Sequence, residues 1–251
     1  MIPKKIYYAW FGKNELPKNI KENIATWKKM NPDYEIIEIN EARKDLFDYE
    51  DYQFAIDAYQ AEKWAFVSDI ARLSAIYKQG GIYLDTDVTA LKSFDDMLDN
   101  DEIWAKENSY TINTGLFFAA KKHSLNIGNI LKLYKSLKFD LTNLTEISTV
   151  MIVSQYFWNK GLSTNNTNIQ HIGNSLIYPT YFFAPLHYWG GGKIIKDSYT
   201  VHKYAASWLS TNKNLNMLIR NYARWLFNQA VLNIEWISKY VAKHKYHDRR
   251  V

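Results

Sequence analysis

Two aspartates one residue apart, Asp85 and Asp87, are the side chains in this sequence best suited to hold a divalent cation. They follow the apolar run Ile82-Tyr83-Leu84, which comes directly after Gly80-Gly81. In an extended chain alternate side chains share one face, so both carboxylates can point toward one ion while Thr86 points away. Carboxylate oxygens suit hard cations such as Mg²⁺ and Mn²⁺. The spacing therefore predicts a cation site able to neutralise a diphosphate.

A triplet of the form Asp-x-Asp is expected about once by chance in a chain of this length, so its context has to distinguish it. A second triplet, Asp99-Asn100-Asp101, lies in the polar stretch 95–102, which is typical of a solvated turn. The first triplet differs because the apolar run before it predicts a buried strand that positions the two carboxylates.

Asp69 and Arg72 lie three residues apart in a predicted helix and therefore share one of its faces. One interpretation is an ordinary ion pair on a helix surface, which would contribute only a few tenths of a kcal/mol. The other is a functional role, because the planar fork of an arginine suits phosphate oxygens.

The elements that must position these residues alternate between strand and helix, a pattern that favours a sheet covered by helices. We expect strands at 6–10, 34–39, around Ile82 and at 115–120, helices at about 17–31, 61–78, 124–138 and 149–160, and a mixed loop and strand region at 178–187. Ligands of open α/β sheets bind at the carboxyl ends of the strands. The residues following these strands are therefore the candidates for the site.

Composition limits the alternatives. The 251 residues are 47% apolar, which fits one α/β domain at 1–212 followed by a tail. The chain has no cysteine, which excludes disulfides and thiolate metal sites, so a metal must bind to Asp, Glu, His or backbone oxygen. We see neither a signal peptide nor 18 consecutive apolar residues, and we expect a cytoplasmic protein.

The tail at 213–251 carries eight basic residues against two acidic ones, whereas the whole chain has a net charge of only +5. Its apolar residues recur at helical spacing, which predicts one or two basic amphipathic helices. Two interpretations stay open: a helix packed on the core with a solvated basic face, or peripheral docking to the anionic inner face of the cell membrane. Nucleic acid is disfavoured as a partner because no nucleic-acid motif accompanies the charge.

Four blocks of the sequence resemble glycosyltransferase family 32, which includes bacterial capsular and surface polysaccharide transferases, fungal initiating mannosyltransferases and, more distantly, clostridial glucosylating toxins. The blocks, in family order, are 2–12, 65–87, 112–120 and 201–208. Together they are far more specific than one triplet, and the resemblance ends near residue 212.

The resemblance implies a GT-A fold, in which a Rossmann-like mixed sheet is flanked by helices, here with a C-terminal helical extension. It also implies a retaining, Mn²⁺- or Mg²⁺-dependent transferase. The implied donor is a nucleotide sugar, with a UDP-sugar favoured, and the implied acceptor is a cell-surface polysaccharide or lipid-linked glycan. The implied catalytic residues are Asp69, Arg72, Asp85 and Asp87.

Further roles come from the resemblance alone. Trp10 would stack on the nucleotide base, although a core aromatic is the alternative. Asn113 would bond the donor sugar, with a satisfied turn amide as the alternative. The remaining implied roles are a metal or phosphate ligand for His202, a metal or phosphate contact for Ser207, an indole N–H donated to the diphosphate for Trp208, and a place beside the nucleotide sugar for Thr86.

Two rival functions use the same carboxylates. A non-catalytic module that binds carbohydrate or a divalent cation would need the acidic pair, but it would not need the Asp69/Arg72 and Ser207/Trp208 elements as well. A glycoside hydrolase would use Asp85 and Asp87 as acid and base. Alternate positions aim both groups the same way, whereas hydrolysis requires carboxyl groups that flank the bond.

Overall fold

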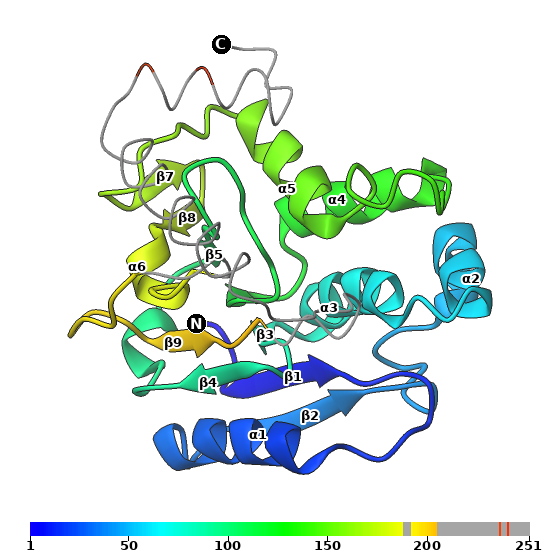
Figure 1. Ribbon diagram of the computed structural model, residues 1–251, viewed down its shortest axis with the longest axis horizontal. Coiled ribbons are helices and arrows are strands. Elements are labelled where there is room, and N and C mark those ends of the chain that lie inside the picture. Colours follow the sequence, from blue (N-terminus) through cyan, green and yellow to red (C-terminus); the bar gives the residue numbers. More distant parts are fainter. Residues whose placement is uncertain (188–191, 205–235, 237–239, 241–251) are drawn as a thin grey trace, which may run out of the picture.

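The structure is a computed structural model that describes residues 1–187, 192–204, 236 and 240. Its centre is a seven-stranded mixed sheet in the order β2-β1-β3-β6-β5-β8-β7 (Figure 1). The strands of this sheet are β1 (Lys5–Ala9), β2 (Glu35–Ile39), β3 (Gly81–Tyr83), β5 (Glu102–Ala105), β6 (Phe118–Ala120), β7 (Gln170–Ile172) and β8 (Ser175–Tyr178). A separate two-stranded sheet pairs β4 (Val88–Ala90) with β9 (Thr200–His202).

Strand directions bring several loops to one edge of the large sheet. β1, β2 and β3 are parallel, and β6 is antiparallel to both β3 and β5. β5 therefore runs in the same direction as β3. Consequently the residues that follow β1, β3 and β5 meet at the same edge as the residues that precede β6, which is the edge where open α/β sheets bind ligands.

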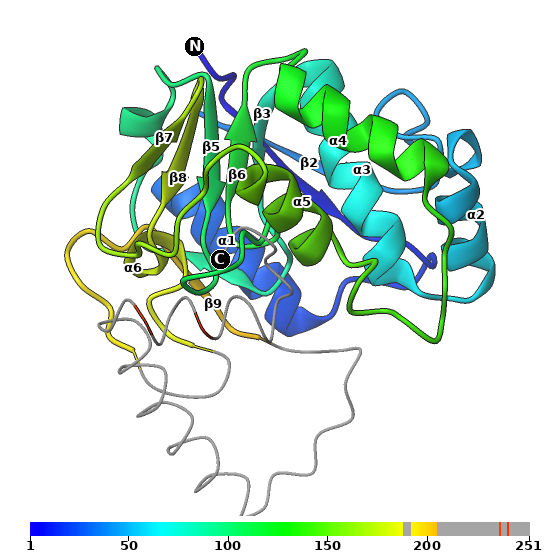
Figure 2. The ribbon, with the colours of Figure 1, turned by 90° about the horizontal axis from the view of Figure 1, so that it is seen from above.

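Alternation along the strands separates two apolar layers. Ile6, Ile82 and Ile103 face one layer, and their neighbours Tyr7, Tyr83 and Trp104 face the other. The Tyr7 side is covered by α2 (Gln53–Gln60), α3 (Trp64–Gln79), α4 (Leu125–Ser136) and α5 (Thr149–Trp158) (Figure 2). The Ile6 side is covered by α1 (Lys18–Met30), the β4–β9 sheet and α6 (Thr180–Phe183). Two 3₁₀ turns lie at Tyr49–Asp51 and Asp95–Met97.

The expected helices at α1, α4 and α5 are confirmed. The Ser124 side chain caps α4 by accepting a hydrogen bond from Ile127 N, and Gly80 ends α3 with a φ of 68°. The helix expected at 61–78 is α3, which begins at Trp64 because Glu62 adopts a left-handed φ of 55°; the preceding helix α2 was not expected. The mixed loop and strand region expected at 178–187 instead contains the short helix α6.

The polar stretch 95–102 is solvated only in part. Asp99 and Asp101 are exposed, as expected, but Glu102 is buried in β5. Its carboxylate accepts hydrogen bonds from Asn126 Nδ2 at 3.0 Å, from Ser175 Oγ at 2.7 Å and from the Ser124 hydroxyl. Those donors replace water and permit a carboxylate inside the protein.

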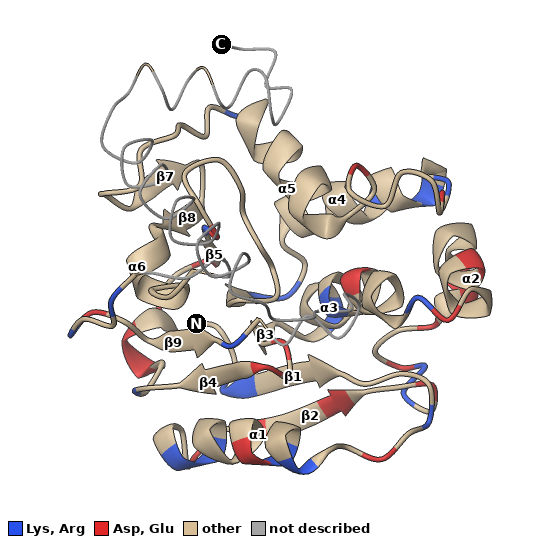
Figure 3. Cartoon of the chain, in the orientation of Figure 1, with Lys and Arg blue, Asp and Glu red and all other residues tan. Residues whose placement is uncertain are grey.

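The mixed sheet flanked by helices confirms the expected fold class. Figure 3 shows acidic and basic positions intermixed along α1, whereas the charged position of α2 is acidic. The tail expected at 213–251 lies outside the described residues, apart from Trp236 and Tyr240. Among the helices that the structure describes, none combines the length and the apolar character needed to cross a bilayer.

Candidate functional site

Asp85 and Asp87 come together through a turn rather than through an extended chain. Val88 N donates a hydrogen bond to Asp85 O at 3.0 Å, so the expected strand-like alternation was wrong. The carboxylates nevertheless converge, because ligand atoms of Asp85, Asp87 and His202 all lie within 4.8 Å of one another. Thr86 lies between them, half-buried, and its carbonyl accepts a hydrogen bond from Asn23 Nδ2 at 2.8 Å.

His202 reaches this cluster from a distant part of the sequence. β9 pairs antiparallel with β4, which places His202 directly opposite Val88. Its Nε2 lies 3.0 Å from Asp87 Oδ1, and Lys203 N donates to Asp87 O at 3.0 Å. Two carboxylates and one imidazole form a donor set that fits a divalent cation with oxygen and nitrogen ligands. The three residues predicted as metal ligands are therefore side by side.

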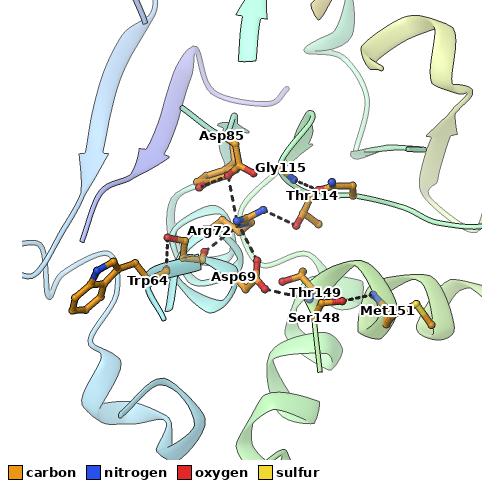
Figure 4. A network of polar contacts seen from close by, with 12 residues as sticks. Trp64, Asp69, Arg72, Asp85, Thr114, Gly115, Ser148, Thr149 and Met151 are labelled. Atoms are coloured by element: carbon orange, nitrogen blue, oxygen red, sulfur yellow. Dashed lines mark hydrogen bonds and ion pairs between the residues drawn. The ribbon is translucent and has the colours of Figure 1, made fainter. Parts of the chain in front are cut away.

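Asp85 is held in place by a buried arginine (Figure 4). Arg72 Nη2 lies 3.2 Å from Asp85 Oδ1, and the Tyr83 hydroxyl donates to the same oxygen at 3.0 Å. Burial opposes the charge of Arg72, but Asp85, Tyr83 and Asp69 outweigh that effect and raise the pKa of the guanidinium further above its ordinary value. The charged arginine therefore fixes one oxygen of the aspartate.

Asp69 and Arg72 share one face of α3, as expected, and they form an ion pair with 3.1 Å between Asp69 Oδ1 and Arg72 Nη2. It is not a surface ion pair, because both side chains are largely buried. Asp69 Oδ2 also accepts a hydrogen bond from Thr149 N, the first residue of α5, at 3.2 Å (Figure 4). Burial raises the pKa of Asp69, while Arg72 and Thr149 act in the opposite direction. This cluster ties α3 and α5 to the Asp85 turn.

The loop before β6 lies against Asp85. The Asn113 side chain donates to Glu107 Oε1 at 3.2 Å and accepts from Gly115 N at 2.8 Å, so both ends of its amide are engaged. This geometry matches the alternative interpretation of Asn113 as a satisfied turn amide. Gly115 O accepts a hydrogen bond from Asp85 N at 2.8 Å, which joins the two loops.

Glu107, a half-buried carboxylate two residues after β5, was not predicted from the sequence. Burial raises the pKa of Glu107. The charge of His202 acts to lower this pKa, and the charge of Asp85 acts to raise it. A prediction of β5 would have pointed to this residue, because it follows a strand that ends at the same edge as β3. The neighbouring Lys106 is buried and donates to the backbone oxygens of Ser109, Ser163 and Asn165 at 3.1, 2.7 and 2.7 Å.

Three further residues were expected in the site: Trp10, Ser207 and Trp208. Trp10 follows β1 and is half-buried, packing against the Ile6 side of the core while its indole N–H donates to Asn14 O at 2.7 Å. Its base-stacking role stays a prediction. Ser207 and Trp208 lie outside the described residues.

We expect the Mn²⁺ affinity of this site to rise with pH. Burial lowers the pKa of His202, but the hydrogen bond to Asp87 and the charges of Asp85 and Glu107 raise it more, so its pKa lies above the ordinary value. The protonated imidazole therefore stabilises the metal-free fold fully below about pH 6.5, and this contribution is lost as the pH rises through the folded pKa. A metal ion requires the neutral ring, so binding must release that proton.

Calorimetric titration with Mn²⁺ in two buffers of different ionisation enthalpy measures this proton release. His202→Gln is expected to bind more weakly and to release no proton from this position. An affinity in the unmodified protein that is the same at about pH 6 and about pH 8 would contradict the assignment of His202 as a ligand.

The part of the chain that contains Asp85 and Asp87 is similar to known proteins. Residues 17–107 match the family described as "Glycosyltransferase sugar-binding region containing DXD motif". The chain is 28% identical over 123 residues to the initiation-specific alpha-1,6-mannosyltransferase of Candida albicans, a match that covers 46% of this chain and 32% of that protein. It is 29% identical over 124 residues to inositol phosphoceramide mannosyltransferase 3 of Schizosaccharomyces pombe, covering 49% and 34%.

The chain thus spans about a third of the length of these two curated relatives. Among solved structures, the PaToxG glycosyltransferase superposes with a TM-score of 0.51 at 18% identity, covering 64% of this chain and 70% of that one. Residues 17–107, which include the Asp85–Asp87 turn, therefore match a glycosyltransferase sugar-binding region with a DXD motif, and the chain has a GT-A fold.

Proposed function

We propose that this protein is a metal-dependent glycosyltransferase that moves a hexose from a nucleotide-sugar donor to a glycan acceptor. The observation that carries the proposal is the cluster of Asp85, Asp87 and His202, two of whose members belong to the matched DXD region. Both curated relatives are named mannosyltransferases, so mannose is the first donor sugar to test. Among nucleotide sugars, a UDP-sugar is the donor that the sequence resemblance favours.

The side chains support a division of roles. Asp85, Asp87 and His202 would hold the cation, which when bound supplies Lewis-acid neutralisation of the donor diphosphate. Arg72 and Tyr83 fix Asp85 before any ligand arrives, and such preorganisation avoids a rearrangement cost during the reaction. Arg72 was also expected to approach the donor phosphates. That role stays a prediction, because Ser68, Asp69, Asp85 and Thr114 already contact its guanidinium.

We propose that the transfer retains anomeric configuration by attack on the face from which the nucleotide leaves. A double displacement would need a free carboxylate nucleophile. Two nearby carboxylates outside the ligand set are engaged with the protein, Asp69 with Arg72 and Thr149, and Glu107 with Asn113. The anomeric configuration of the product, determined by NMR, tests whether the transfer retains configuration, and an inverted product would contradict the proposal.

A panel of sugar nucleotides tests the function itself. Nucleotide release should occur with one donor in Mn²⁺ or Mg²⁺, stop with EDTA and resume when metal is restored. Transfer that is insensitive to chelator would contradict the metal site. Tight binding of donor or cation without turnover on any acceptor would instead favour the non-catalytic binding module.

Trp10→Ala is expected to weaken nucleotide binding by about tenfold to a hundredfold. This factor corresponds to the free energy of one base stacked on an aromatic ring. The position of Trp10 directly after β1, at the edge that carries Asp85, supports this prediction. Calorimetry with the nucleotide measures the effect. Unchanged affinity, or a variant that unfolds, would instead make Trp10 a core residue.

We propose that the acceptor is a cell-surface polysaccharide or lipid-linked glycan reached at an anionic membrane surface, with the protein on the cytoplasmic side. The excess basic charge at 213–251 supports this proposal. Trp236 and Tyr240 are exposed by 71% and 61%, and exposed Ile194 and Ile195 lie between two lysines. Apolar side chains flanked by basic ones suit a lipid interface.

A chain ending at Asn212 tests the tail. We expect donor binding to remain nearly intact, because the expected donor contacts all precede that residue, while binding to anionic vesicles is lost. Vesicle binding by the full chain should weaken as salt screens the charges. Vesicle co-sedimentation together with a melting curve decides, since an insoluble truncation and a full chain that does not bind vesicles would show that the tail packs on the core.

A further inference from the structure

Side chains on one face of α1, together with its C-cap residue Asn31, form hydrogen bonds with the backbone of residues 86–94, the segment that begins between Asp85 and Asp87. The contacts are Asn23 Nδ2 to Thr86 O at 2.8 Å, Trp27 Nε1 to Val88 O at 2.9 Å, Ala90 N to Thr26 Oγ1 at 3.0 Å and Phe94 N to Asn31 Oδ1 at 2.9 Å. Within the described part of the chain, β4 pairs with a strand on one edge only, where β9 lies. The side chains of α1 therefore satisfy backbone groups on its other edge, as a second strand would.

Asn23 differs from the others of these residues because it reaches both segments that supply ligands. Its Nδ2 bonds Thr86 O, between Asp85 and Asp87, and its Oδ1 accepts a hydrogen bond from Lys203 Nζ at 2.6 Å, next to His202. The orientation of the amide is fixed chemically, because a carbonyl can only accept and an ammonium can only donate. Asn23 itself is 2% exposed, so water has little access to its amide, although Lys203 is exposed.

We propose that Asn23 is a positioning residue of the metal site, whose buried amide fixes the turn that carries Asp85 and Asp87 relative to the segment that carries His202. The inference rests on the proposed function, because it takes this cluster as a metal site. Asn23 is not itself a ligand. It acts through the backbone of Thr86 and the side chain of Lys203, and together with the Lys203 N–H bond to Asp87 O it holds the two segments together.

The effect of removing the Asn23 amide on Mn²⁺ affinity follows from the hydrogen bonds that are lost with it. Without the amide, Thr86 O and Lys203 Nζ lose buried partners and the two ligand segments can move apart. Loss of a group that orients metal ligands typically costs about 10–100-fold in metal affinity. Asn23→Ala should therefore weaken Mn²⁺ binding by about that factor.

Thr26→Val is the matched control. It removes the hydrogen bonds of Thr26 Oγ1 with Ala90 N, in β4 beyond the ligands, and with the backbone oxygen of Asn23, but it leaves both side-chain bonds of Asn23 in place. It should lower the melting temperature and leave the Mn²⁺ affinity unchanged. Asn23→Asp keeps the size of the side chain and the acceptor for Lys203 but removes the donor to Thr86. It should fold, and it should bind Mn²⁺ more weakly even though it adds negative charge.

Mn²⁺ affinity is measured by calorimetry without donor, alongside the melting temperature of the metal-free protein. Weaker binding in both Asn23 variants but not in Thr26→Val establishes the positioning role. Unchanged affinity in Asn23→Asp, or an equal loss in Thr26→Val, overturns it. Absence of Mn²⁺ binding by the unmodified protein would instead overturn the metal site of the proposed function, so the two failures are distinguishable.

Discussion

Gly115→Ala is expected to abolish metal binding and sugar transfer together. A Cβ at this position would lie 1.9 Å from Asp85 Oδ2, 2.6 Å from its Cγ and 3.1 Å from Arg72 Nη1. Non-bonded heavy atoms do not approach a Cβ to within 2.6 Å, and Asp85 cannot move aside without disturbing its contact with Arg72. A displacement of about 1 Å in a reacting centre can cost about a hundredfold in rate, so we expect a loss of at least that size.

The clash explains this effect without backbone strain, because Gly115 is not among the glycines with positive φ. Gly128→Ala is the control. Its Cβ would meet the edge of the Tyr77 ring at 3.1 Å, and alanine favours the α4 helix. Mn²⁺ titration and a turnover assay of both variants check the prediction. A Gly115→Ala protein that binds Mn²⁺ normally would show that Asp85 is not a ligand in this position.

Asp87→Asn is expected to abolish turnover while the protein stays folded. The asparagine has nearly the same shape but no negative charge, so both the metal site and the hydrogen bond to His202 lose their ionised partner. Because Asp87 is a proposed ligand, the loss should exceed the roughly 10–100-fold that removal of an outer partner costs. Nucleotide release in Mn²⁺, with a melting curve for each variant, measures both effects.

Asp85→Asn should be as inactive but less stable, because Arg72 would then keep only Asp69 as its ionic partner in a buried place. Asp99→Asn provides the matched control from the second, exposed triplet and should behave like the unmodified protein. Full activity of Asp85→Asn or Asp87→Asn would remove the basis of the metal assignment.

The local parts of this site could be predicted from the sequence. A buried strand before Asp85, together with helical spacing between Asp69 and Arg72, identified side chains that do lie together. Both signals depend on neighbours in the chain, where the periodicity of strands and helices is decisive. The turn at residues 86–87 was missed because hydrogen bonds to α1 and to the loop before β6 impose it.

Long-range pairing explains most of what the sequence could not show. His202 came from the family resemblance alone, since nothing near it in the chain indicates that β9 pairs with β4. Glu102 appeared solvated because its burial depends on donors from α4 and β8. Asn23 stands in an ordinary amphipathic helix, and only the packed structure shows that its amide reaches Thr86 and Lys203.

The pairing of β4 with β9 also sets a time order for synthesis. Positions 87 and 202 are 115 residues apart, and at typical translation rates of about 5–20 residues per second the ribosome needs several to about twenty seconds to pass from one to the other. During that interval α1 can already dock on β4, but the third ligand does not yet exist. Completion of the cation site thus coincides with emergence of nearly the whole sheet, so a nascent chain cannot hold the metal as the finished protein would.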